Sequence, residues 1–223
     1  MLITIPSVLS SNRLQSIYSL LKDANFVNGS LSAGSAAKRV KNNEEVAMNA
    51  AQINQLNNIV MGSLVANPQY KSAALPHRIA APFYARYTEG MEYGNHVDDP
   101  VMGGADRYRS DVSITVFLSK PEDYDGGELV IQTSFGEQQI KLNAGDAVLY
   151  PSSSLHHVNP VTRGERLVAV TWVQSMIRNA EQRELLYRLN TARESLLSNS
   201  PESLESKDVD ICYANLVRMW SEL

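Results

Sequence analysis

The 223-residue sequence is poor in cysteine, in net positive charge and in long apolar runs. Its single cysteine, Cys212, can form neither an internal disulfide nor a zinc site of paired cysteines. Since disulfides are typical of oxidising compartments, we expect the chain to be cytoplasmic. Lysine and arginine number 20 against 24 aspartate and glutamate residues, a formal net charge of −4, so we expect no nucleic-acid partner.

Membrane segments and a signal peptide are not expected either. No stretch approaches the roughly 18 consecutive apolar residues that a membrane-spanning helix requires. The N-terminus, MLITIPSVLSS, has no basic residue before its short apolar run, and no small-residue cleavage site follows. This pattern favours a first strand at 2–5 over a signal peptide.

Helical periodicity dominates the first third of the chain after that strand. Apolar residues recur at helical spacing from Leu14 to Leu21, behind the N-cap candidates Ser10 and Ser11. The Gly/Ser/Ala-rich stretch 28–37 is interpreted as a loop. A second helix is predicted from about Asn43 to Val65, where Asn67-Pro68 ends it.

From about residue 80 the periodicity becomes that of strands. Short runs rich in Val, Ile, Tyr and Phe are separated by turn sequences at Gly126-Gly127, at 143–146 and at 160–164. Short strands at roughly even spacing are typical of an antiparallel sandwich or barrel.

The predicted fold class is therefore α+β, with a mainly β core between two helical segments. We expect a helical N-terminal segment at 1–77 that packs on the core, a core at 78–177 and a helical C-terminal segment at 178–223. In the last segment, apolar residues at helical spacing predict two helices, with a break and a new N-cap at 200–203.

One histidine of the four stands in a pattern that suits a metal site. His96 lies two residues before Asp98, in the run YGNHVDDP (93–100). In an extended chain such residues point to the same side, with roots about 6–7 Å apart, so an imidazole and a carboxylate can converge on one ion. Asp99 would point away, and His77, beside Pro76, is interpreted as a loop or packing residue. The pattern is short and by itself weakly specific.

A second imidazole for this site would come from the adjacent pair His156 and His157. Side chains alternate across a strand, so at most one of the pair faces the interior, but alternation does not say which. Two histidines and one carboxylate on one face of an octahedral ion are the arrangement of non-heme iron(II) oxygenases.

Arg166 strengthens this interpretation, because it begins a predicted return strand of largely apolar composition. One face of that strand would carry Arg166, Val168, Val170 and Trp172, and the other Leu167, Ala169, Thr171 and Val173. An arginine among apolar residues is costly unless it meets an anion. The guanidinium pairs with a carboxylate in bidentate fashion, which suits 2-oxoglutarate. A strand-end arginine that reaches solvent is the alternative.

Taken together, the motifs resemble those of the PKHD-type hydroxylases, which belong to the prolyl 4-hydroxylase-like branch of the iron(II)/2-oxoglutarate oxygenases. The motifs are Tyr87, Gly90, Tyr93, the HxD at 96–98, GGEL (126–129), Gly145-Asp146, YPSSSLH (150–156), PVTRGER (160–166) and WVQSMIR (172–178). The resemblance spans most of the chain, including FVNGSLSAGSAAKRVKNNEE (26–45). The second histidine, His157, departs from it and leaves the third ligand ambiguous.

The resemblance implies a double-stranded β-helix (jelly-roll) core. It implies iron(II) bound by His96, Asp98 and His156, and 2-oxoglutarate held by Arg166 with a hydrogen bond from Tyr87. The implied activity is hydroxylation with release of succinate and CO2, with ascorbate as the compound that re-reduces the iron.

Two other classes of function remain open. One is a metal-binding jelly-roll hydrolase or isomerase, in which Arg166 has no evident role. The other is a non-catalytic interaction domain whose C-terminal helices form a partner or homodimer surface. The substrate, a small molecule or a peptide, cannot be read from the sequence. The loop 99–109 suits a mobile lid over it, and equally a plain surface loop.

Overall fold

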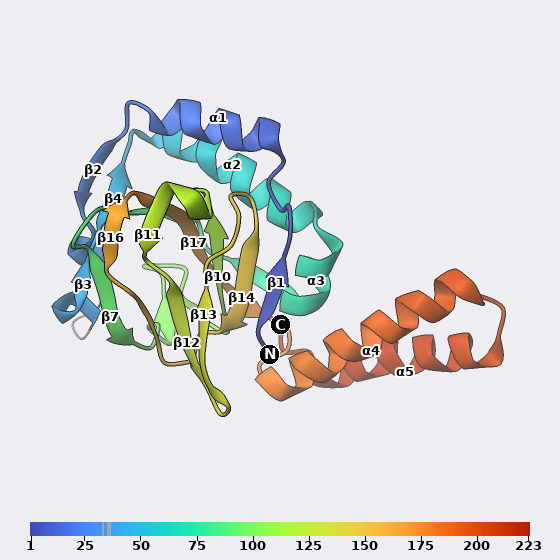
Figure 1. Ribbon diagram of the computed structural model, residues 1–223. Coiled ribbons are helices and arrows are strands. Elements are labelled where there is room, and N and C mark those ends of the chain that lie inside the picture. The colour runs from blue at the N-terminus through green and yellow to red at the C-terminus, as the bar shows by residue number, and fades with distance from the viewer. Residues whose placement is uncertain (33, 35–36) are drawn as a thin grey trace.

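A computed structural model describes residues 1–32, 34 and 37–223 of the chain, and its centre is a pair of antiparallel β-sheets (Figure 1). The larger sheet has eight strands, in the order β1-β14-β10-β17-β6-β4-β2 with β5 also paired to β17. Their bounds are β1 (Ile3–Ile5), β2 (Asn25–Asn28), β4 (Glu44–Ala47), β5 (Pro76–Ile79), β6 (Phe83–Tyr87), β10 (Val112–Phe117), β14 (Ala147–Pro151) and β17 (Arg166–Ser175).

The smaller sheet has five strands, in the order β13-β12-β15-β7-β3. Their bounds are β3 (Lys41–Asn42), β7 (Glu92–His96), β12 (Leu129–Thr133), β13 (Gly136–Ile140) and β15 (His156–Val158). Two short ribbons complete the strands, β8 (Val101–Met102) with β9 (Tyr108–Arg109) and β11 (Tyr124–Gly126) with β16 (Val161–Gly164).

Helices cover the outer face of the larger sheet. They are α1 (Ser11–Leu21), α2 (Ala50–Ala66) and α3 (Pro68–Ala74). Their buried residues Ile17, Leu56 and Tyr70 share one apolar cluster with residues of β10 and β17. A second apolar cluster, made by both sheets, fills the space between them. The predicted α+β class with a mainly β core is confirmed.

Strand β17 separates the two clusters by simple alternation. Leu167, Ala169 and Val173 belong to the cluster under the helices, whereas Val168 belongs to the cluster between the sheets. The two faces predicted from the sequence are thus those of the folded strand, and Arg166 begins on the inner one.

The N-terminal third contains more strands than predicted, because β2, β3, β4 and β5 follow the expected strand β1, and it has a third helix, α3. Residues 44–47 form the strand β4, paired with β2 and β6, and not the first turns of a helix. The helix α2 begins only at Ala50, where the Asn49 side chain accepts a hydrogen bond from the Gln52 amide as its N-cap. Sheet pairing thus overrides the helical pattern of NNEEVAM (42–48).

The other expectations for this third are mostly confirmed. The helix α1 begins at Ser11 behind the cap Ser10. The predicted loop 28–37 contains a 3₁₀ turn at Gly29–Ser32, and a second 3₁₀ turn, Ala37–Arg39, begins at its last residue. Residues 33, 35 and 36 lie outside the described residues. A third 3₁₀ turn lies at Pro121–Asp123.

The C-terminal helices form a hairpin that extends away from the sheets (Figure 1). They are α4 (Ala180–Asn199) and α5 (Leu204–Trp220), and Ser203 caps the second. Both helices and the break between them were predicted. Among the described residues, no helix is long and apolar enough to cross a membrane.

Candidate active site

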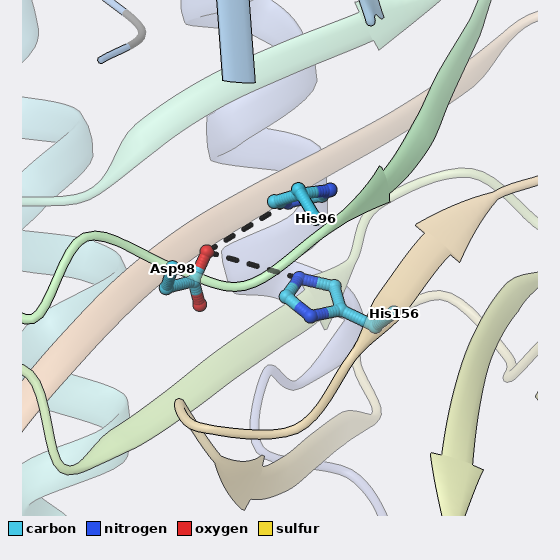
Figure 2. A group of neighbouring side chains, drawn as sticks. All are labelled: His96, Asp98 and His156. Atoms are coloured by element: carbon cyan, nitrogen blue, oxygen red, sulfur yellow. Dashed lines mark ion pairs between the residues drawn. The ribbon is translucent and has the colours of Figure 1, made fainter. Parts of the chain in front are cut away.

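Three side chains that could bind a metal meet at one end of the smaller sheet. His96 ends β7, Asp98 follows two residues later, and His156 begins the neighbouring strand β15 directly opposite His96. One ligand atom from each lies within 4.8 Å of the others. Asp98 Oδ1 is 3.8 Å from His96 Nε2 and 3.7 Å from His156 Nε2 (Figure 2). The three residues proposed from the sequence are therefore brought together.

Both imidazoles are held in the tautomer that a metal requires. His96 Nδ1 donates to the Gly94 carbonyl at 2.8 Å, and His156 Nδ1 donates to the Ser154 carbonyl at 2.9 Å. Each Nε2 therefore keeps its lone pair for an ion. Burial and the neighbouring His156 lower the pKa of His96 to about 4, so its ring is neutral at physiological pH.

Asp98 is oriented by two donors that the sequence analysis did not assign to it. The Trp172 indole donates to Asp98 Oδ2 at 2.8 Å, and the Ser113 hydroxyl donates to the same oxygen. Ser113 in turn lies 2.8 Å from the Ser152 hydroxyl. Because Oδ2 is engaged, Oδ1 is the oxygen left for a metal. Ser113, Ser152 and Trp172 come from three different strands or their ends, so no spacing in the sequence predicts that they meet.

His157 is turned away from this group. Its Nδ1 lies 2.9 Å from Asn95 Oδ1 and its Nε2 lies 3.1 Å from Asn159 Oδ1. His156 is buried. The geometry thus favours His156 as the third ligand. Asp99 and His77 are outside the cluster as well.

The cluster opens into a cavity of about 560 Å³ that also contains Arg166. The Arg166 side chain is only 2% exposed, and its guanidinium carbon lies 5.0 Å from the centre of the Tyr87 ring and 5.6 Å from that of Phe117. Its Nε has no hydrogen-bond partner among the described residues, and none of the ion pairs among the described residues, at N–O distances up to 4.0 Å, involves Arg166. A buried cation without a counterion is costly, so this geometry fits an anionic ligand.

The strand register explains why Tyr87 accompanies Arg166. The two residues are directly opposite each other on β6 and β17. Burial raises the pKa of Tyr87, and raises that of Tyr150 on the cavity wall well above its usual value, so both phenols stay protonated and can donate hydrogen bonds. Thr115 and the buried Asn43 also line the cavity and were not found from the sequence.

The mouth of the cavity is largely apolar. Phe83 packs edge-on against Trp172, with ring centroids 5.8 Å apart, and Val97 is a further apolar residue of the lining. The β8–β9 ribbon within the loop 99–109 contributes further residues to this lining, among them Met102 and Tyr108. The loop therefore borders the cavity, as a lid would.

The comparisons with known proteins agree on one superfamily. The family model for the 2OG-Fe(II) oxygenase superfamily matches residues 82–174. A PKHD-type hydroxylase of Thioalkalivibrio sulfidiphilus is 50% identical over 224 residues, and one of Aliarcobacter butzleri is 43% identical over 226 residues. Both alignments cover 100% of each chain.

Solved structures show the same fold at low sequence identity. A Pseudomonas putida prolyl-4-hydroxylase aligns over 78% of this chain and 92% of its own, with a TM-score of 0.52 and 20% identity. A Trichoplax adhaerens prolyl hydroxylase, solved with a hypoxia inducible factor peptide fragment, aligns over 83% and 86%, with a TM-score of 0.56 and 18% identity. The expected jelly-roll fold is thereby confirmed.

Proposed function

This chain belongs to the PKHD-type hydroxylases of the 2OG-Fe(II) oxygenase superfamily, and we propose that His96, Asp98 and His156 hold its iron, while Arg166 and Tyr87 hold 2-oxoglutarate. The enzyme is a dioxygenase that hydroxylates a small-molecule or peptide substrate. One observation carries the assignment of residues: a single cavity contains both the histidine–aspartate–histidine cluster and a buried arginine without an anionic partner.

The donor set fits iron(II). Two neutral imidazole nitrogens and one carboxylate oxygen form a facial triad, which leaves the remaining positions of an octahedral ion free. When bound, iron(II) and 2-oxoglutarate supply the oxidising chemistry, in which dioxygen is consumed, 2-oxoglutarate becomes succinate and CO2, and a substrate C–H becomes C–OH. Trp172 and Ser113 fix the Asp98 carboxylate through its Oδ2, so that its Oδ1 would stay available to the ion.

The protein residues perform the remaining tasks. Arg166 offers its guanidinium fork to the far carboxylate of 2-oxoglutarate, and the protonated Tyr87 hydroxyl donates to the same group. Because Arg166 and Tyr87 are opposite each other on paired strands, this anchor is rigid. The apolar mouth, with Phe83 and Met102, excludes water from the reacting group and receives an apolar part of the substrate.

An anaerobic iron(II) titration tests the ligand assignment. His96→Ala and Asp98→Ala should each abolish tight iron binding and succinate release, because two remaining ligands hold a labile divalent ion poorly. Asp99→Ala, which removes the adjacent carboxylate outside the cluster, is the matched control and should bind iron as the wild type does. Iron affinity like that of the wild type in both His96→Ala and Asp98→Ala would refute the assignment.

Consumption of 2-oxoglutarate distinguishes the oxygenase from the hydrolase or isomerase alternative. An oxygenase consumes dioxygen and releases succinate from 2-oxoglutarate even without substrate, at a low rate, whereas a hydrolase does neither. We propose that ascorbate sustains this substrate-free reaction by re-reducing the iron. A time course of succinate release with and without ascorbate measures that effect.

The remaining expectations on organisation also stand as proposals. We propose the segment boundaries 1–77, 78–177 and 178–223, and the family match at 82–174 supports the central segment. We propose a homodimer through the C-terminal hairpin, because Ile211 and Met219 are exposed on α5; sedimentation velocity measures it. A cytoplasmic location and the lack of nucleic-acid or membrane partners are proposed from the composition.

A further inference from the structure

The hairpin of β12 and β13 carries an aromatic side chain fully in solvent. Phe135, at its tip, is 97% exposed, the largest exposed fraction of any large apolar residue in the described chain. Thr133 and Gly136 pair directly across the turn, so the loop has only two residues. This hairpin extends beyond the neighbouring strands (Figure 1).

The tip is held in a defined conformation. The Thr133 hydroxyl accepts a hydrogen bond from the Phe135 amide at 3.2 Å and donates to the Gly136 carbonyl at 2.8 Å. Gly136 has φ +108°, a conformation that other residues rarely adopt. A short loop fixed by its own side chain presents Phe135 to solvent without letting it fold back onto the sheet.

The tip lies at the metal end of the molecule. The strand β12 pairs with β15, and Ile131 of β12 lies opposite the proposed ligand His156. One residue further on, the Gln132 amide donates to the Leu155 carbonyl. From Ile131 the chain runs two more residues to Thr133 and then turns. At about 3.3 Å per residue, Phe135 therefore lies roughly 10 Å beyond His156 along the strand.

Other exposed apolar residues lie near the metal cluster. Phe83, Val97 and Val101 line the cavity and are exposed, and exposed Leu155 directly precedes His156, the first residue of the strand β15 that pairs with β12. Single exposed apolar residues need no explanation, but several gathered around one active-site mouth mark a binding surface.

Resting on the proposed function, we propose that Phe135 is a substrate-docking residue. It binds an apolar side chain of a polypeptide substrate, three or four residues from the residue that is hydroxylated in the cavity. Three extended residues span about 10 Å, which matches the distance from His156 to the tip. A metabolite small enough for the cavity does not reach Phe135.

The charges at this end are mixed and form no basic cluster in β13 or the loop 99–109, which favours a polypeptide over a polyanionic ligand. Glu137 follows Phe135 by two residues on β13, and the loop 99–109 carries Asp99 and Asp106 together with Arg107 and Arg109. The chain has a net charge of −4. A nucleic acid, or an anionic membrane surface, would need clustered lysine and arginine instead.

A library of 13-residue peptides tests the proposal on the intact, iron-loaded enzyme. The central residue is varied over all types except Cys, Met and Trp, which oxidise without an enzyme. One Leu or Phe is placed in turn at each other position of a Gly/Ala/Ser/Glu background. Mass spectrometry detects a gain of one oxygen. We expect turnover to be greatest with the apolar residue three or four positions from the centre.

The Phe135→Ser variant should raise the KM for those peptides roughly 10- to 100-fold, the value of one well-buried apolar contact. Phe135→Leu should restore most of the loss. Val65→Ser, which changes an exposed valine on α2, is the matched control and should leave the KM unchanged. Iron binding and substrate-free succinate release should be the same in all of these variants.

The outcomes separate this inference from the proposed function. If wild-type enzyme releases succinate but hydroxylates no peptide, or shows no preference for the position of the apolar residue, the docking proposal is wrong and the oxygenase assignment stands. An unchanged KM in Phe135→Ser overturns it too. Loss of succinate release in the wild type itself would instead count against the proposed function.

Discussion

Replacing Arg166 by alanine is the most direct perturbation of the proposed cosubstrate site. The side chain is 2% exposed, its Nε is without a hydrogen-bond partner in the described chain, and it lies against the Tyr87 and Phe117 rings. The substitution therefore removes a cation that no described protein carboxylate compensates. It leaves the His96–Asp98–His156 cluster in place.

The magnitude follows from the burial. A charge-assisted bidentate pair in a dry site contributes about 2–5 kcal/mol when one partner is truncated. At 1.4 kcal/mol for each factor of ten, the apparent affinity for 2-oxoglutarate should fall roughly 30- to 4,000-fold. Arg166→Lys should recover only part of this, because an ammonium group offers a point charge and no fork.

Two measurements check the result. The first is the dependence of succinate release on 2-oxoglutarate, with iron affinity measured in parallel and expected to be nearly unchanged. The second is thermal unfolding, in which 2-oxoglutarate should stabilise the wild type and not the variant at the same concentration. Arg163→Ala is the matched control, because Arg163 is an exposed arginine on β16 that pairs with Asp125. An Arg166→Ala protein with the 2-oxoglutarate dependence of the wild type would mean that the cosubstrate binds elsewhere.

Four further variants, in three experiments, test the rest of the site. His156→Ala should lose iron and activity while His157→Ala retains most of both, because the His157 ring nitrogens already face amide oxygens; an inactive His157→Ala with intact His156→Ala in side-by-side titrations would reverse the assignment. Trp172→Phe removes the donor to Asp98 but keeps an aromatic wall, so iron affinity should fall roughly 10- to 100-fold; an unchanged affinity would show that the indole does not position the carboxylate. Gly103 has φ +90°, and in Gly103→Ala the added Cβ would lie 2.5 Å from the Asp106 backbone oxygen, so the β8–β9 ribbon should be distorted. Substrate-coupled turnover should then fall while iron and 2-oxoglutarate binding stay intact. Unchanged coupled turnover would argue against a lid.

Much of this site could be predicted because its residues follow the period of a strand. His96 and Asp98 converge because they are two residues apart at the end of β7. Arg166 faces the interior because β17 alternates between two apolar clusters. For the adjacent histidines His156 and His157, strand alternation did not decide which one faces the interior. The resemblance to a family favoured His156, and the geometry of the site favours it as well.

Other parts could not be predicted because they depend on pairing between distant segments. Ser113, Ser152 and Trp172 meet near Asp98 only through the order β14-β10-β17 of the larger sheet. Asn43 lies in the cavity wall because the chain between β3 and β4 joins both sheets, whereas its neighbouring glutamates favour a helix when read locally.

The central strand β17 explains why the two halves of the site keep a fixed relation. Arg166, at its start, anchors the proposed carboxylate, and Trp172, six residues later on the same face, orients the Asp98 carboxylate. The strand is paired on one side to β10 and on the other to β6 and β5, so its backbone cannot shift without breaking both ladders. A cosubstrate held by Arg166 would therefore keep a fixed position relative to the Asp98 carboxylate. The β8–β9 ribbon, the β12–β13 tip and the other rim segments are free to vary with the substrate.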